Sequence, residues 1–230
     1  MKAVHDLTLR LAERRSAPAF HPRGVTCAGE LHVPGSDDGH WAAPWLDRRG
    51  SYEATVRWSR ALGLPGGLPD GLGLALRAKD ADGSGTALDL LFTSSRAGRL
   101  GRHVPVLRHR ALAGPYSTLV SYRAGDRERV LAAFPVRGAH GPVGAGLPSL
   151  RRALARGPVR FELCAAAPDE PWRLFATLVL GAAHPVPERS TVSYDPYIHN
   201  LPELRPTDRW SGLRKAAYSG SRHGRTAGTS

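Results

Sequence analysis

The sequence has little cysteine, little lysine and no long apolar run. Its only two cysteines, Cys27 and Cys164, lie in apolar, strand-like runs, so we expect buried free thiols, with a disulfide as the open alternative. Lysine occurs only at Lys2, Lys79 and Lys215. No run reaches the roughly 18 apolar residues of a membrane helix, and the start of the chain lacks a signal-peptide pattern. We therefore expect a soluble, cytoplasmic protein without membrane contact.

Motifs of hydrolase, nucleotide and metal chemistry are also missing. The 10 histidines form no His-x-Asp or His-x-x-x-His grouping, and no Cys-x-x-Cys pair occurs. The sequence contains neither a Gly-x-Ser-x-Gly elbow nor a phosphate-binding P-loop. Hydrolysis and nucleotide chemistry are therefore unsupported.

Positive charge is the strongest compositional feature. The 230 residues carry a formal net charge of +12, a balance that normally favours nucleic acid or an anionic membrane surface. Because the basic residues are nearly all arginine in a chain rich in alanine, glycine and proline, we interpret much of this charge as compositional drift on a solvated surface. In a nucleic-acid-binding module Trp41, Trp45 and Trp58 would be stacking surfaces, but no RNA-binding motif accompanies them and core packing explains them better. Nucleic acid is not an expected partner.

Short runs with strand character dominate the middle of the chain, and turn-rich segments separate them. With 41% hydrophobic residues, they can build one core. Eight such strands in a single domain over residues 1–225, followed by a disordered tail at 226–230, indicate a barrel or a sandwich. The eight predicted strands are Gly24–Val33, Ser51–Ser59, Leu72–Arg77, Thr86–Phe92, Tyr116–Tyr122, Arg129–Val136, Val159–Ala166 and Trp172–Gly181.

Three helices and one extended segment complete the expected fold. A short amphipathic helix near the N-terminus must end before Pro18. A second helix is predicted over Pro148–Arg156 and a third over Thr207–Ser221. Between the last strand and the third helix, the proline-rich segment Pro185–Pro206 has several fixed φ angles and is predicted to be an extended strap that delivers that helix to a defined place.

The C-terminal helix carries an unusual set of side chains. At helical spacing, Arg214, Tyr218, Arg222 and Arg225 share one face. Nearby guanidiniums favour the phenolate form of a tyrosine, and tyrosinate is an axial ligand of haem iron. The alternative is a basic, solvated helix that happens to contain a tyrosine.

A second polar group lies near the N-terminus. His21 precedes the first strand, and Gly24 allows the backbone to turn there. In the alternating run Val56-Arg57-Trp58-Ser59, Arg57 and Ser59 face one side and the apolar residues face the other. Together these residues would supply an imidazole, a guanidinium and a hydroxyl. The alternative for His21 is a surface turn.

These segments resemble haem catalases, in the same order along the chain. His21-Pro22-Arg23-Gly24 resembles the His-Ala-Lys-Gly segment that carries the distal histidine, and Val56-Arg57-Trp58-Ser59 resembles Val-Arg-Phe-Ser. Arg214-x-x-x-Tyr218 resembles the Arg-x-x-x-Tyr of the proximal helix. Further similar segments are Asp70–Arg77, Asp89-Leu90-Leu91 and Tyr194-Asp195-Pro196 through Asp208. The chain resembles a small, minicatalase-like bacterial haem protein.

The resemblance implies a mainly β fold with α (α+β), an antiparallel eight-stranded β-barrel with the three helices, and haem (iron protoporphyrin IX) as cofactor. It implies that Tyr218 is the iron ligand and that His21 is the distal acid/base, with Ser59 hydrogen-bonded to its far ring nitrogen. Its cofactor-binding residues would be Arg57, Arg214, Tyr218 and Arg225, with Arg57 and Arg225 on the propionates and Arg214 donating to the phenolate.

Two departures from the catalase pattern bear on activity. Phe92, Thr93 and Ser94 stand where catalases have Gly-Asn-Asn, so the hydroxyl of Thr93 replaces an amide that positions peroxide. Pro18 replaces an arginine that pairs with a propionate. The chain is also much shorter than a typical catalase.

The resemblance therefore implies a haem-dependent peroxidase or catalase-related oxidoreductase acting on hydrogen peroxide or organic hydroperoxides, with an organic reductant. His21 would take a proton from the peroxide and return it to the leaving oxygen, and disproportionation would be slow without the amide. The alternatives are a hydroperoxide isomerase or biosynthetic oxidase, a non-catalytic basic binding module, and a degenerate barrel without haem. The physiological substrate, the reductant and the oligomeric state stay open, and a homodimer is compatible with the sequence.

Overall fold

Eight strands pair in a closed antiparallel ring. A computed structural model describes residues 23–36, 41–63, 68–136, 138, 140–183 and 192–207. Every predicted strand is confirmed to within two residues at either end. The strands of the ring are β1 (Arg23–Val33), β2 (Gly50–Arg60), β3 (Asp70–Ala78), β4 (Leu88–Ser94), β6 (Tyr116–Ala124), β7 (Arg127–Pro135), β8 (Val159–Ala166) and β9 (Arg173–Ala183).

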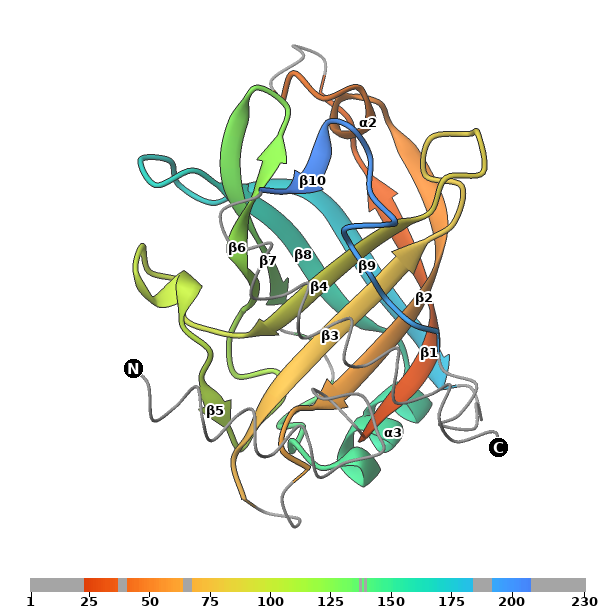
Figure 1. Cartoon of the computed structure of the whole chain (residues 1–230). Coiled ribbons are helices and arrows are strands. Elements are labelled where there is room, and N and C mark those ends of the chain that lie inside the picture. Colours follow the sequence, from red (N-terminus) through yellow and green to blue (C-terminus); the bar gives the residue numbers. More distant parts are fainter. Residues whose placement is uncertain are drawn as a thin grey trace, which may run out of the picture.

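The ring closes between β6 and β7. Neighbours follow the order β6-β4-β3-β2-β1-β9-β8-β7, and β7 pairs again with β6 (Figure 1). Two short strands lie off the ring: β5 (Leu107–Arg108) pairs with β3, and β10 (Leu204–Pro206) pairs with β6. A barrel rather than a sandwich is therefore the architecture, and closure leaves no free strand edge in the ring.

The barrel interior is sealed by aromatic side chains from facing walls. Trp58 of β2 and Tyr116 of β6 each meet the ring of Phe161 on β8 edge to face, with ring centroids 5.9 Å apart in both pairs. Trp58 Nε1 donates to the Tyr116 hydroxyl at 3.0 Å, which donates in turn to the carbonyl of Ala111 at 2.6 Å. Trp41 and Trp45 are buried as well. These tryptophans are core residues, as the sequence predicts, and not stacking surfaces.

Cys27 and Cys164 are buried and free. This confirms the expected buried free thiols and excludes the alternative of a disulfide between them. Burial raises the pKa of the Cys27 thiol and of the Cys164 thiol to about 12. Both groups therefore stay protonated and behave as small apolar side chains.

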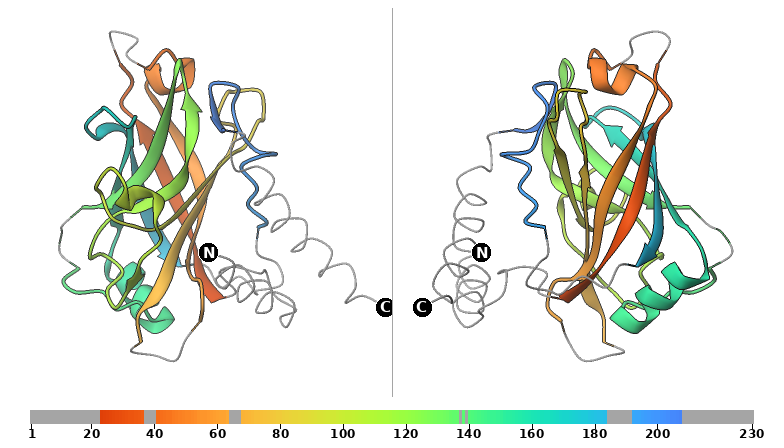
Figure 2. Two further views of the ribbon diagram at one scale, coloured as in Figure 1. Left: turned by 60° about the vertical axis from the view of Figure 1, so that its left-hand side comes forward. Right: turned by 90° about the vertical axis from the view of Figure 1, so that its right-hand side faces the viewer.

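The helices are short and lie at opposite ends of the barrel (Figures 1 and 2). Helix α3 (Leu147–Arg156) confirms the predicted middle helix and ends at Gly157, whose φ of 148° suits glycine. Helix α2 (Pro44–Asp47) and the 3-10 turn η1 (Gly101–His103) are not predicted, because so few residues carry no readable periodicity. No helix within the described residues is long and apolar enough to cross a bilayer.

Residues 192–207 cross the outer surface of the barrel (Figures 1 and 2, blue). The sequence predicts an extended strap here, and the structure corrects this in part. A turn follows Asp195, whose carbonyl accepts from the N–H groups of Ile198 and His199 at 3.1 and 2.9 Å, and a bridge joins Leu201 to Leu204. Asp195 makes the turn because its carboxylate also accepts from a backbone N–H two residues on. The predicted N-terminal helix, the C-terminal helix beyond its first residue and the tail lie outside the described residues.

Candidate functional site

Three predicted site residues share the outer face of β2 to β4. Because Trp58 points into the barrel, its neighbours Arg57 and Ser59 point outward. Ser59 lies opposite Gly24 on β1 and Gly73 on β3, and Gly73 lies opposite Thr93 on β4. Gly24, Ser59, Gly73 and Thr93 thus form one row across the strands, and the next row on the same face contains Thr26, Arg57, Ala75 and Leu91. We call these two rows the outer-face patch: Gly24, Thr26, Arg57, Ser59, Gly73, Ala75, Leu91 and Thr93.

Ser59 is 3% exposed and its hydroxyl donates to the Gly73 carbonyl at 3.3 Å. With its hydrogen directed at a carbonyl, the oxygen can still accept. An acceptor is what a ring N–H of a nearby histidine would need, as the predicted role requires.

Arg57 lies flat across Gly24. A Cβ built on Gly24 would stand 3.0 Å from Cζ and Nε of Arg57, and also 3.0 Å from Cβ of Ser59. A larger residue at position 24 would therefore require Arg57 and Ser59 to shift by a few tenths of an ångström, so glycine suits this close approach. The Arg57 residue is 9% exposed.

Thr93 is half-buried, and its backbone pairs with Gly73 and with Ser117 of β6. No described residue forms a hydrogen bond with its hydroxyl. The group can donate or accept at this end of the patch. A side-chain amide would offer two donors at the same place, so Thr93 supplies weaker positioning than asparagine.

The buried carboxylate of Asp89, one row further along the same face, joins the barrel to residues 192–207, which we call the crossing segment. Asp89 of β4 is fully buried and accepts two bonds from the facing Arg77, each 2.6 Å long, through Nε and Nη2. It accepts a third from the N–H of Asp195 at 2.6 Å. Arg77 also donates to the carbonyl of Ser193 at 2.8 Å, and the N–H of Asp89 donates to the carbonyl of His199 at 2.9 Å. We call this group the Asp89 clamp.

The Asp89 clamp is a positioning device that the sequence does not reveal as such. Arg77 and Asp89 lie directly opposite each other, a pairing visible only once the strand register is known. The pair raises the pKa of the Arg77 guanidinium, mainly through the hydrogen bond with Asp89. The clamp holds residues 193–199 against the barrel beside the outer-face patch.

Tyr194 closes the patch on the clamp side. Its hydroxyl donates to the Thr55 carbonyl at 3.3 Å, and the Arg77 guanidinium lies 5.7 Å from its ring centroid. Burial, with a smaller contribution from Asp89, raises the pKa of this phenol well above its usual value, although Arg57 acts in the opposite direction. Tyr194 is thus a neutral phenol next to Arg57.

The other predicted site residues, His21, Arg214, Tyr218 and Arg225, lie outside the described residues. Within the described part of the chain, no group of three or more His, Cys, Asp or Glu side chains could hold a metal ion. The structure thus brings together Arg57, Ser59 and Thr93.

The chemistry of the outer-face patch fits part of a haem site. Gly73 and Ala75 add little side-chain bulk beside Arg57 and Ser59, which permits a planar macrocycle to approach the strands closely there. The Arg57 fork suits a carboxylate such as a propionate. Ser59 suits a histidine N–H. The predicted iron ligand and distal base are the two parts of the site that this patch does not contain.

Comparison with known proteins supports the fold alone. No family model matches the sequence, and no curated protein matches it. Among solved structures, a fungal catalase aligns with a TM-score of 0.64 and 12% identity, over 95% of this chain and 62% of that chain. A bacterial catalase aligns with a TM-score of 0.64 and 13% identity, over 97% of this chain and 60% of that chain. The chain thus has a catalase-like barrel and spans about three fifths of these catalases' length.

Proposed function

We propose that this chain binds haem at the outer-face patch and is a haem-dependent oxidoreductase that acts on hydrogen peroxide or an organic hydroperoxide. The observation that carries the proposal is the placement of Arg57, Ser59 and Thr93 on one outward face of a catalase-like barrel, beside the segment that the Asp89 clamp holds. The catalase likeness supports the fold, and the patch supports the cofactor.

In this proposal three residues of the patch, Arg57, Ser59 and Thr93, each have one task. Arg57 binds a propionate, and the absence of a side chain at Gly24 leaves room for its guanidinium. Ser59 accepts the far ring N–H of His21 and so keeps the other ring nitrogen directed at the peroxide. Thr93 donates one hydrogen bond to the peroxide.

The remaining tasks belong to residues predicted from the sequence. His21 takes a proton from the peroxide and returns it to the leaving oxygen. Tyr218 would hold the haem iron through its phenolate, Arg214 would donate to that phenolate, and Arg225 would bind the second propionate. Haem, when bound, supplies the redox-active iron. The proposed partners are the peroxide and an organic reductant, and the proposed location is the cytoplasm.

Haem titration with two variants tests this proposal. Tyr218→Phe is expected to abolish the charge-transfer bands of tyrosinate-ligated ferric haem, because phenylalanine cannot ligate iron. Arg57→Gln is expected to weaken haem binding about tenfold, since a charge-assisted hydrogen bond is lost. Both effects are measured by absorbance of the full chain loaded with haem.

Arg160→Gln is the matched control for Arg57. Arg160 lies on β8, away from the patch, and its side chain is exposed. Its substitution removes the same charge and is expected to leave haem affinity unchanged. The proposed site is wrong if the tyrosinate bands survive in Tyr218→Phe. It is also wrong if Arg57→Gln and Arg160→Gln weaken haem binding equally.

The haem-loaded protein is expected to oxidise a dye with peroxide and to release oxygen slowly. Thr93 supplies one hydroxyl where an amide would supply two donors, so peroxide is held less firmly. Thr93→Asn is expected to raise oxygen release several-fold relative to dye oxidation. An oxygen electrode and a dye assay measure the ratio.

Oxygen release by the unaltered chain at catalase-like rates would contradict this prediction. Conversion of an organic hydroperoxide without consumption of dye would instead favour the isomerase alternative. Thr93→Ser, which keeps the hydroxyl, is the control and is expected to leave the ratio unchanged.

A further inference from the structure

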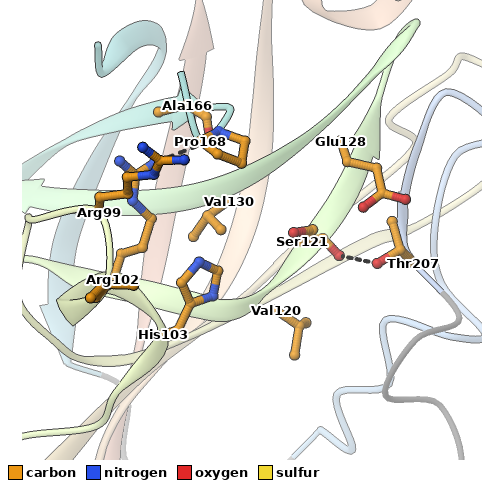
Figure 3. A pocket seen from close by; sticks show the side chains of 11 residues that line it. Arg99, Arg102, His103, Val120, Ser121, Glu128, Val130, Ala166, Pro168 and Thr207 are labelled. Carbon is orange, nitrogen blue, oxygen red and sulfur yellow. Dashed lines mark hydrogen bonds between the residues drawn. The ribbon is translucent and has the colours of Figure 1, made fainter. Parts of the chain in front are cut away.

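A cavity separate from the outer-face patch lies against β6 and β7. It has a volume of about 340 Å³ and shares no residue with the patch. Figure 3 shows Arg99, Arg102 and His103 toward one end and Glu128 with Thr207 toward the other. The cavity is therefore polarised, with cations at one end and a carboxylate at the other.

Arg102 is the central observation because its charge is buried without a counter-charge. The side chain is 6% exposed and forms no ion pair with a described residue. Nη1 donates weakly to the carbonyls of Ala166 and Ala167 at 3.3 and 3.5 Å, and the buried Nε has no hydrogen-bond partner. The guanidinium stacks on Trp172, 4.5 Å from its ring centroid. A buried cation that lacks a carboxylate partner is costly unless an anion joins it.

Arg99 adds a second cation next to the first. Burial lowers the pKa of the Arg102 guanidinium, and the like charge of the nearby Arg99 lowers it further. Asp169 pairs mainly with Arg127, at 2.8 Å, and interacts more weakly with the charge of Arg99. Because Asp169 is shared between Arg127 and Arg99, and no described acid pairs with Arg102, the end of the cavity that Arg99 and Arg102 line carries excess positive charge.

The cavity wall is built by a strained bulge in β6. The register of β6 shifts between Ser117 and Ser121, and Leu119 in this bulge has a φ of 60°. The Leu119 carbonyl accepts from Nδ1 of His103 at 2.8 Å, so Nδ1 carries a hydrogen and Nε2 is the ring atom left for a ligand. The Ser117 hydroxyl donates to the Arg102 carbonyl at 2.5 Å. These bonds tie η1 to the bulge and hold both lining residues in place.

The rest of the cavity limits what can enter. Val120 and Val130 supply an apolar floor, and the Thr207 hydroxyl is already bonded to the Ser121 carbonyl at 3.1 Å. The carboxylate of Glu128 repels negative charge at the far end. An occupant should therefore carry its charge at one end and an apolar body behind it.

We propose that this cavity binds a small organic anion whose carboxylate or phosphate group pairs with Arg99 and Arg102 and whose body lies over Val120 and Val130. The site needs no haem. Failure of one proposal therefore leaves the other intact.

Calorimetric titration of the full chain, at low salt and without haem, tests the site with three probes. Benzoate and phenyl phosphate offer a carboxylate and a phosphate on the same ring, and benzamide is the neutral counterpart of benzoate. We expect saturable binding of at least one anion and none of benzamide. Preference between the two anions identifies the head group. Arg99→Gln is expected to weaken binding about tenfold.

Arg96→Gln is the matched control, because Arg96 is exposed on the same loop and does not line the cavity. It is expected to change affinity by less than twofold. The proposal is overturned if neither anion shows saturable binding or if benzamide binds as well as benzoate. It is also overturned if Arg96→Gln weakens binding as much as Arg99→Gln. Arg99 is exposed, so its replacement does not endanger folding.

Discussion

Replacing Asp89 with alanine is expected to lower the free energy of unfolding by about 3–5 kcal/mol, the usual cost of removing one partner of a buried ion pair. The loss leaves the Arg77 guanidinium without its carboxylate and the N–H of Asp195 without its acceptor. Urea unfolding measures the change. Asp89→Asn, which keeps the shape of the side chain, is expected to lose less.

Glu53→Gln is the control for Asp89. Glu53 and Lys79 form an ion pair of 3.5 Å in which both side chains are mostly exposed, and such pairs contribute little. We expect a change within about 0.5 kcal/mol. Equal costs at the two positions would show that the Asp89 clamp does not hold the crossing segment. If the haem proposal is correct, Asp89→Asn also weakens haem binding, whereas Glu53→Gln does not.

Replacing Trp58 with alanine is expected to cost about 3–5 kcal/mol, the range for an aromatic side chain removed from a sealed core. Trp58 is fully buried, packs against Phe161 and donates to Tyr116. Removing it opens a cavity in the barrel and a polar mismatch at the Tyr116 hydroxyl. Thermal and urea unfolding measure the loss.

Tyr116→Phe is the graded comparison for Trp58→Ala. It keeps the ring but leaves Trp58 Nε1 without an acceptor, so we expect a loss of about 1–3 kcal/mol. If Trp58→Ala lowers the free energy of unfolding by less than Tyr116→Phe does, these rings do not seal the interior.

Most of the secondary structure could be predicted from the sequence because it depends on local pattern. The run Val159–Ala166 is predicted at its observed bounds, and α3 begins one residue earlier than predicted. At one strand end a polar side chain competes with strand pairing. The strand predicted from Thr86 begins at Leu88, because the carboxylate of Asp82 draws the preceding residues into a turn. Elements as short as β5 and β10 were missed, since they exist only through pairing with distant strands.

The site was predictable only in part, for the same reason. Alternation placed Arg57 and Ser59 on one face, but it does not say whether that face is inside or outside the barrel. Only the packing of Trp58 against Phe161 decides this. Arg77 received no role from the sequence, because its partnership with Asp89 depends on the register between β3 and β4.

The strands, the middle helix and the burial of the tryptophans can be predicted from the sequence because they follow from the spacing and polarity of neighbouring residues, whereas only the fold excludes a disulfide between the two thiols. Three further features are visible only in the fold: the strands close into a ring, Arg57, Ser59 and Thr93 lie on its outer surface, and Arg99 and Arg102 line one cavity. Contacts between residues far apart in the chain depend on strand register and on loop placement, and neither is encoded in any local pattern.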